Sequence, residues 1–117
     1  MRPRLQNPLL IAALLLWATA SAAANLVPSQ VLGNTQQLNG QDISVIGVIS
    51  FLKAGITPDG KPYQSFKLCD TNACLQVYTR DKSTYTEGKQ VTVEGHFWAV
   101  RHEGATPHFN ELVLDTD

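Results

Sequence analysis

Aromatic, amide and basic side chains alternate with apolar ones along two short segments in the middle of the chain. These segments, residues 63–69 and 74–80, are separated by a short polar turn. Because successive side chains of a strand point to opposite faces, this alternation predicts two half-buried strands paired as a β-hairpin. One face would belong to the core and consists of Phe66, Leu68, Leu75, Val77 and Thr79. The opposite face could stack on, hydrogen-bond to or neutralise a ligand, and consists of Tyr63, Ser65, Lys67, Gln76, Tyr78 and Arg80.

That polar face has a second, ordinary interpretation. Exposed tyrosines on neighbouring strands stabilise a sheet through cross-strand contacts without any ligand. Lysine and arginine side chains are mostly exposed on protein surfaces, where water solvates their charges. The pattern therefore leaves open whether the face binds a ligand or only meets solvent.

Cys69 and Cys74 are the only cysteines, and each lies at the turn end of one predicted strand. An even number of cysteines favours a disulfide in a chain with an export signal, such as the leader described below. Closing so short a loop would stabilise the fold by about 2 kcal/mol. Thioredoxin-type redox sites have a different cysteine spacing, and a zinc site would need two further ligands. We therefore predict a structural disulfide that fixes the turn and the register of the hairpin.

Three histidines, His96, His102 and His108, recur at six-residue intervals. A metal site would require their side chains to converge. The first belongs to a predicted strand and the other two to the loop after it, so nothing in the spacing fixes such a convergence. We predict surface histidines, and no metal or other cofactor.

Catalytic arrangements are not indicated by the spacing of the polar residues. The chain has no glycine-rich phosphate loop, and no free thiol remains if both cysteines are bridged. A metal-dependent nuclease would need clustered carboxylates, and Asp59, Asp70 and Asp81 do not obviously converge. We therefore predict that the protein is not an enzyme, and a metal-dependent hydrolase is the weakest of the functions considered.

Residues 1–24 have the layout of a secretory signal peptide. Two arginines form a basic start, and residues 9–17 are apolar and uncharged. Residues 18–24 all have small side chains. The apolar stretch is shorter than the roughly 20 residues that a membrane-spanning helix needs. We therefore expect this segment to be removed, leaving a periplasmic or secreted protein with no membrane anchor.

The balance of charge limits the partners of the mature chain. Removal of Arg2 and Arg4 leaves seven Lys and Arg against ten Asp and Glu, a net charge of −3. Proteins that hold nucleic acid unselectively neutralise phosphates with many clustered cations, and a basic footprint over the whole surface is absent here. A local basic stripe on or beside the hairpin face remains possible, from Lys53, Lys61, Lys67, Arg80, Lys82 and Arg101.

The rest of the chain supplies three more strands and their connections. Residues 25–41 are polar and predict a flexible lead-in, with at most a short helix at 28–32. A long first strand is predicted at 41–53, with a bend or bulge at Gly47. Trp98 falls on the side of its strand opposite to the apolar residues, and we expect the lead-in or a loop to cover it. Two further strands are predicted at 90–100 and 109–115, and loops at 54–62, 81–89 and 101–108.

The order of these motifs resembles the OB-fold of the anticodon-binding, nucleic-acid-binding type. A first strand containing glycine precedes the segment Phe66–Asp70, which matches the family's second strand ending in aspartate. The family's Gly-Lys-x-Val-x-Val-x-Gly signature is matched by Gly88, Lys89, Val91, Val93 and Gly95. The resemblance extends from Asp42 to Asp115. It implies an all-β domain at 42–117, folded as a five-stranded OB-fold Greek-key barrel.

The resemblance also implies where a ligand would bind. Such barrels use the outer face of strands two and three with the flanking loops. Here the implied ligand-binding residues are Tyr63, Lys67, Gln76, Tyr78 and Arg80, with Lys61 and Arg101 from the loops. The loops also carry Lys53, Asp59, His102 and His108. We therefore expect a non-catalytic module that binds single-stranded nucleic acid, and the alternative is an envelope module that binds a protein or a small ligand.

Overall fold

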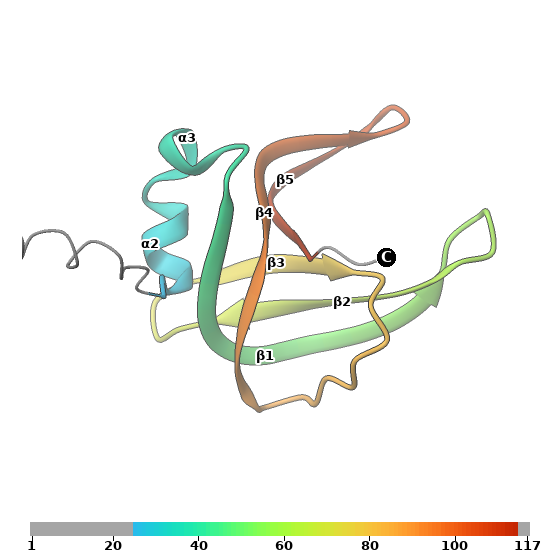
Figure 1. Cartoon of the computed structure of the whole chain (residues 1–117), viewed down its shortest axis with the longest axis horizontal. Helices are drawn as coiled ribbons and strands as arrows, with labels where there is room; N and C mark the ends of the chain where they lie inside the picture. The colour runs from blue at the N-terminus through green and yellow to red at the C-terminus, as the bar shows by residue number, and fades with distance from the viewer. Residues whose placement is uncertain (1–24, 115–117) are drawn as a thin grey trace, which may run out of the picture.

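The computed structural model describes residues 25–114 and shows a five-stranded sheet that closes on itself in a ring (Figure 1). The expected signal peptide and the last three residues lie outside the described residues. The described elements, in chain order, are α2 (Pro28–Leu32), α3 (Thr35–Leu38), β1 (Asp42–Ile56), β2 (Pro62–Cys69), β3 (Cys74–Thr79), β4 (Gln90–Glu103) and β5 (Thr106–Leu114).

The strands follow one another round the closed sheet in the order β1-β2-β3-β5-β4. All neighbouring pairs are antiparallel except β3 and β5, which run parallel. In that parallel pair Gln76 lies opposite Glu111, and Tyr78 lies opposite Val113. The closure therefore brings the last strand beside the predicted hairpin.

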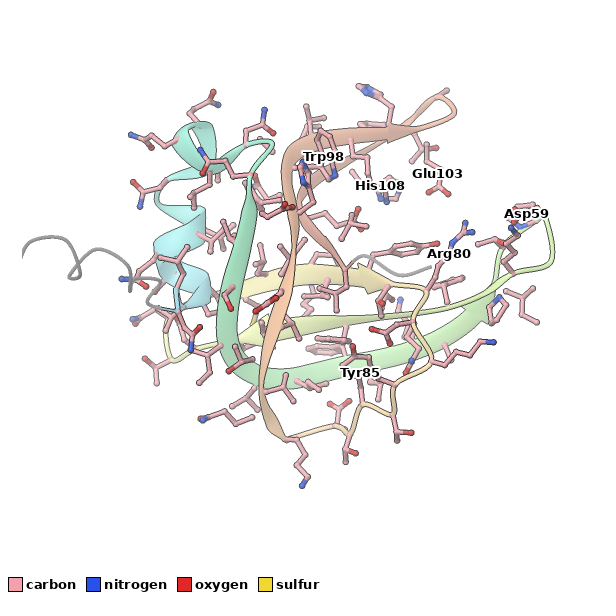
Figure 2. The ribbon with its side chains drawn as sticks, in the orientation of Figure 1. Asp59, Arg80, Tyr85, Trp98, Glu103 and His108 are labelled. Atoms are coloured by element: carbon pink, nitrogen blue, oxygen red, sulfur yellow. A yellow bond between two sulfur atoms is a disulfide. The ribbon has the colours of Figure 1, made fainter. Side chains whose placement is uncertain are left out.

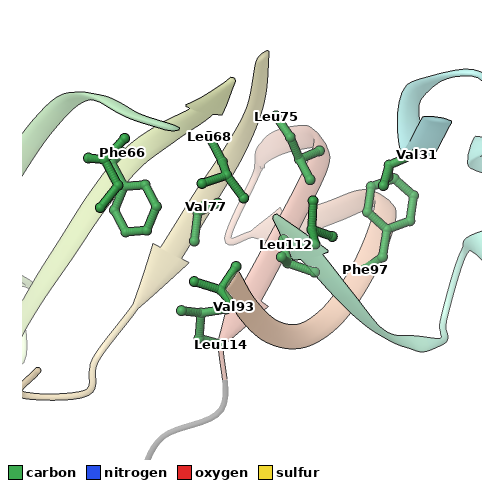
Figure 3. Close-up of a cluster of buried hydrophobic side chains, with 11 residues drawn as sticks. Val31, Phe66, Leu68, Leu75, Val77, Val93, Phe97, Leu112 and Leu114 are labelled. Carbon is green, nitrogen blue, oxygen red and sulfur yellow. The ribbon is translucent and has the colours of Figure 1, made fainter. Parts of the chain in front are cut away.

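The predicted core face of the hairpin is confirmed. Phe66, Leu68, Leu75, Val77 and Thr79 are all fully buried. The four apolar ones meet side chains of other elements in one hydrophobic cluster (Figure 3), whose other members are Val31, Val45, Ile49, Val93, Phe97, Leu112 and Leu114. The predicted disulfide between Cys69 and Cys74 is also present, and the two residues face each other as the last pair of the β2–β3 register.

The long first strand serves two partners, as its central glycine indicated. Its first half pairs with β4 and its second half with β2, and the change occurs at Val48. A Cβ on Gly47 would lie 2.9 Å from the side chain of Leu68, so only glycine allows this approach. The bulge itself lies a few residues further on, where the register with β2 shifts between Ser50 and Lys53.

The segment before β1, expected to be flexible, is folded against the closed sheet. Val31 on α2 is fully buried and belongs to the core cluster. The Asp70 carboxylate accepts hydrogen bonds from the Ser29 hydroxyl (2.6 Å) and backbone N–H (2.9 Å), which ties α2 to the hairpin turn. These bonds, with others from the backbone N–H groups of Asn72 and Ala73, hold the pKa of Asp70 well below its usual range. The sequence showed no apolar period here because each short helix buries too few side chains.

The segment at 101–108, expected to be a loop, is mostly strand. Arg101 pairs with His108, and the register continues to Glu103 and Thr106. Gly104, with a φ of 63°, supplies the tight turn. The alternation is missing here because this end of β4 and β5 extends beyond the core. The β1–β2 hairpin extends in the same direction, so two arms project from one side of the ring (Figure 1).

Within the described part of the chain, the helices are too short and too polar to cross a membrane.

Candidate ligand-binding groove

A groove of about 720 Å³ lies between the two arms, over the outer face of β2 and β3. Its walls come from the second half of β1 and from the far ends of β4 and β5. Five of the seven residues predicted from the sequence line it, namely Tyr63, Lys67, Gln76, Tyr78 and Arg101. The arms thus convert the polar face of the hairpin into a concave surface.

The other two predicted residues stand outside the lining. Lys61 is exposed in the turn between β1 and β2. Arg80 follows β3, and its Nε donates a hydrogen bond to the Tyr78 hydroxyl at 3.3 Å. This contact, supported by the charges of Asp59 and Glu103, raises the pKa of Arg80. Figure 2 shows Arg80 between the two arms, with Asp59 on one and Glu103 on the other, so it lies at the mouth of the groove.

Two tyrosines form an aromatic floor. The rings of Tyr63 on β2 and Tyr78 on β3 are stacked, with centroids 5.4 Å apart and planes inclined by 25°. The Tyr63 ring lies against the backbone of Gly55 so closely that a Cβ on Gly55 would be 2.6 Å from the tyrosine hydroxyl oxygen. The guanidinium of Arg101 lies 5.5 Å from the centre of the Tyr78 ring. One glycine and one arginine therefore position the two rings.

Phe51 is a third aromatic residue of the groove, and the sequence did not indicate it. Alternation along β1 from Val45 and Ile49 would place Phe51 inside the core. The bulge inserts one residue, so Leu52 takes the inward direction and the Phe51 side chain remains 69% exposed. Phe51 has a φ of 54°, a conformation that bulky residues rarely adopt. Its backbone N–H and that of Leu52 each donate to the Glu87 carboxylate at 3.0 Å.

The floor also contains a buried ion pair that the sequence did not indicate. Glu111 on β5 is only 4% exposed, although it lies on the outer face of the sheet. Its Oε1 accepts a hydrogen bond from Nε of Arg101 (2.8 Å) and lies 2.6 Å from Nη2 of the same guanidinium. Alternation with the buried Leu112 and Leu114 puts Glu111 on the outer face, and the parallel pairing with β3, which places it beside Gln76, follows only from the closed sheet.

The remaining charges leave the groove with unpaired cations. Glu103 pairs with His108 (3.2 Å) and Glu111 with Arg101. No ion pair joins Lys53 or Lys67 to a carboxylate of residues 25–114. The groove thus offers two free ammonium groups beside its aromatic floor, and Lys61 and Arg80 lie close outside it.

The three histidines do not come together. His96 on β4 contacts Asp42 (2.8 Å), and His108 contacts Glu103. Over residues 25–114, no group of three or more His, Cys, Asp or Glu side chains is placed to hold a metal ion. Trp98 stacks obliquely on His96, with ring centroids 4.6 Å apart. It is 36% exposed, so the expectation that the lead-in or a loop covers it is wrong.

Comparison of the chain with models of protein families gives no match, and comparison with curated proteins gives no significant match.

Proposed function

We propose that the closed sheet is an OB-fold and that the groove binds a short single-stranded oligonucleotide without catalysing a reaction. The proposal of the fold family rests on the motif order from Asp42 to Asp115 and on the order of strands round the ring. A small closed β-sheet whose second and third strands present a ligand face is characteristic of that family.

The observation that carries the functional proposal is the stacked pair of Tyr63 and Tyr78 beside unpaired lysines. Single-stranded nucleic acids bind where aromatic rings offer stacking surfaces and cations follow the phosphates. Phe51 adds a third ring from the wall that β1 forms. Lys53 and Lys67 line the same groove, so phosphates next to a stacked base can meet a positive charge.

The number of available cations sets the strength of binding. Lys53, Lys61, Lys67 and Arg80 could neutralise about three or four phosphates. For single strands the logarithm of the binding constant then falls against the logarithm of salt with a slope of roughly −2 to −3. With a net charge of −3 on the mature chain, we expect modest affinity that high salt abolishes.

We also propose that the protein is exported and acts in the periplasm or outside the cell. The support is the leader-like sequence at 1–24 together with the Cys69–Cys74 disulfide, which is compatible with an oxidising compartment. Mass spectrometry of the protein recovered from the periplasm tests this. The expected mass is that of a chain beginning near Asn25, and an intact N-terminus would contradict it.

The test of binding is a titration of a labelled single strand of about ten nucleotides, followed by fluorescence anisotropy at low and at moderate salt. We expect saturable binding with the salt slope given above. Lys67→Ala should weaken it and reduce the slope by about 0.7. Lys89→Ala, which removes an exposed lysine outside the groove, is the matched control. An absence of binding at low salt would contradict the proposal.

A second candidate function is favoured by the apolar side chains on the arms. Ile56 is 71% exposed and Phe109 is 65% exposed. Exposed apolar groups of this kind also occur where a protein partner docks. The test is retention of an envelope protein by the immobilised domain after nuclease treatment. Retention by the wild type, and its loss in each of the variants Ile56→Asp and Phe109→Asp, would favour this function over the first.

A further inference from the structure

The second carboxylate oxygen of Glu111 has no hydrogen-bond donor within the described part of the chain. Its Oε1 receives both contacts from Arg101, and no side chain or backbone N–H of residues 25–114 donates to Oε2. Gln76, which lies opposite Glu111 on β3, directs its amide to the backbone carbonyl oxygens of Phe66 and Val77 instead. The side chain of Glu111 is 5% exposed and lines the groove.

The burial of Glu111 Oε2 without a donor is unfavourable unless a ligand in the groove donates a hydrogen bond to it. A buried charged oxygen without a donor loses its hydration and gains nothing in return. Because Arg101 holds the Glu111 carboxylate, the side chain cannot rotate to solvate Oε2 elsewhere. Tyr78 lies on the strand beside it, and the same Arg101 guanidinium packs on the Tyr78 ring. A planar group that stacks in the groove near Tyr78 therefore lies within reach of a fixed acceptor.

We propose that Glu111 Oε2 accepts a hydrogen bond from the exocyclic amino group of a base, so that the groove prefers cytosine, adenine and guanine to thymine and uracil. This inference rests on the proposed function. The amino groups of the first three bases project from the ring edge and are donors. The one ring N–H of thymine or uracil lies between two carbonyl oxygens, which a carboxylate repels. Arg101 acts here as a positioning residue.

The expected size of the preference follows from the charge on the acceptor. Hydrogen bonds to ionised groups contribute more than neutral ones, and a mismatched base would leave the buried oxygen unpaired. We expect a strand with an amino-bearing base at this position to bind about tenfold more tightly than a strand with thymine or uracil there.

The test compares short strands of 5-methylcytosine with strands of thymine in deoxyribose form. The two bases share the ring size and the methyl group, so they differ in the exocyclic group and the adjacent ring nitrogen. Tighter binding of the 5-methylcytosine strand by about tenfold supports the inference. Equal affinities overturn the inference and leave the proposed function standing. If neither strand binds at low salt, both fail.

Glu111→Gln gives a readout that a purely structural role would not change. The amide carbonyl can still accept from Arg101, which leaves the amide NH₂ as a donor towards the groove. The preference should then disappear or reverse in favour of thymine, which presents a carbonyl acceptor. An unchanged preference in a folded Glu111→Gln protein would also overturn the inference. If this variant does not fold, the comparison of the two strands on the wild-type protein decides the question.

Discussion

The Glu87 carboxylate on the β3–β4 connection accepts a hydrogen bond from the backbone N–H of Phe51, with 3.0 Å between the two atoms. Its other oxygen accepts from the next N–H, so both donors of the bulge are satisfied by one distant side chain. Phe51 keeps its left-handed backbone conformation under this restraint. The direction of one groove wall therefore depends on a residue well outside the groove.

Glu87→Gln should weaken oligonucleotide binding by a fewfold, because the amide can satisfy only one of the two donors and the bulge loses its restraint. The loss of one hydrogen bond to a charged group should also lower the free energy of unfolding by about 1 kcal/mol. Anisotropy titrations and urea denaturation measure these two effects. Glu94→Gln, at an exposed position of β4, is the control and should change neither.

Phe51→Gly removes the aromatic ring and puts in its place a residue that tolerates the positive φ, so it tests the ring alone. Glycine adopts a φ of 54° without penalty, so this variant should be as stable as the wild type while it binds oligonucleotide less well. If Phe51→Gly binds as tightly as the wild type, Phe51 is not part of the ligand surface.

Gly55→Ala should displace the Tyr63 ring and weaken binding with little effect on stability. The added methyl group would overlap the flexible end of Tyr63, on an arm that extends beyond the core. Contacts that act through one side chain are not additive, so a double-mutant cycle identifies the route. Once Tyr63→Ala is present, Gly55→Ala should have no further effect on affinity. Independent, additive losses would show that Gly55 acts in some other way.

Asp70→Asn should destabilise the protein at neutral pH by about 1 to 2 kcal/mol, comparable to the loss of a helix cap. The carboxylate holds Ser29 and the hairpin turn, and an amide cannot accept all these bonds. Since folding lowers the pKa of Asp70, its stabilisation is full above the unfolded pKa of about 4 and is lost as the pH falls towards the lower folded value.

Urea denaturation at pH 7 and near pH 3 measures this effect. The wild type should lose more stability than Asp70→Asn over that range, so the two proteins should become more alike in acid. Glu94→Gln, at an exposed position of β4 with no ion pair among residues 25–114, serves as the control. A constant difference between wild type and Asp70→Asn at both pH values would contradict the assignment.

Replacement of both Cys69 and Cys74 by serine should lower the free energy of unfolding by about 2 kcal/mol and leave oligonucleotide affinity unchanged. The bridge closes the β2–β3 turn, which lies beside α2 and away from the two arms (Figure 1). The groove is lined by residues of the arms and by the outer face of β2 and β3. Thermal melting and anisotropy give the two values. A large loss of affinity in the folded variant would show that the turn contributes to the ligand surface.

The alternation of residues 63–79 was sufficient to predict the hairpin, its core face and most of the groove floor. It was sufficient because period two holds wherever one face of a strand is buried and no residue is inserted. Phe51 escaped prediction because a bulge reverses the face of every residue after it, and no residue type marks that bulge in the sequence.

Glu111 and Val31 were missed for a different reason. The position of Glu111 depends on the parallel pairing of β3 with β5, which joins segments far apart in the chain. Val31 is one of two buried residues, with Pro28, on a helix too short to show a period. Both roles arise from tertiary arrangement, so local patterns carry little information about them.

The most direct test of the groove as a ligand site is the affinity of Tyr78→Ala for a short single strand at low salt, measured beside Phe109→Ala. Phe109 is an exposed aromatic residue of an arm that does not line the groove, so it matches the loss of a ring without touching the floor. We predict that Tyr78→Ala weakens binding by about tenfold, the lower range for loss of a stacked base, while Phe109→Ala binds as the wild type does. Equal affinities for the wild type and Tyr78→Ala would contradict the proposed site.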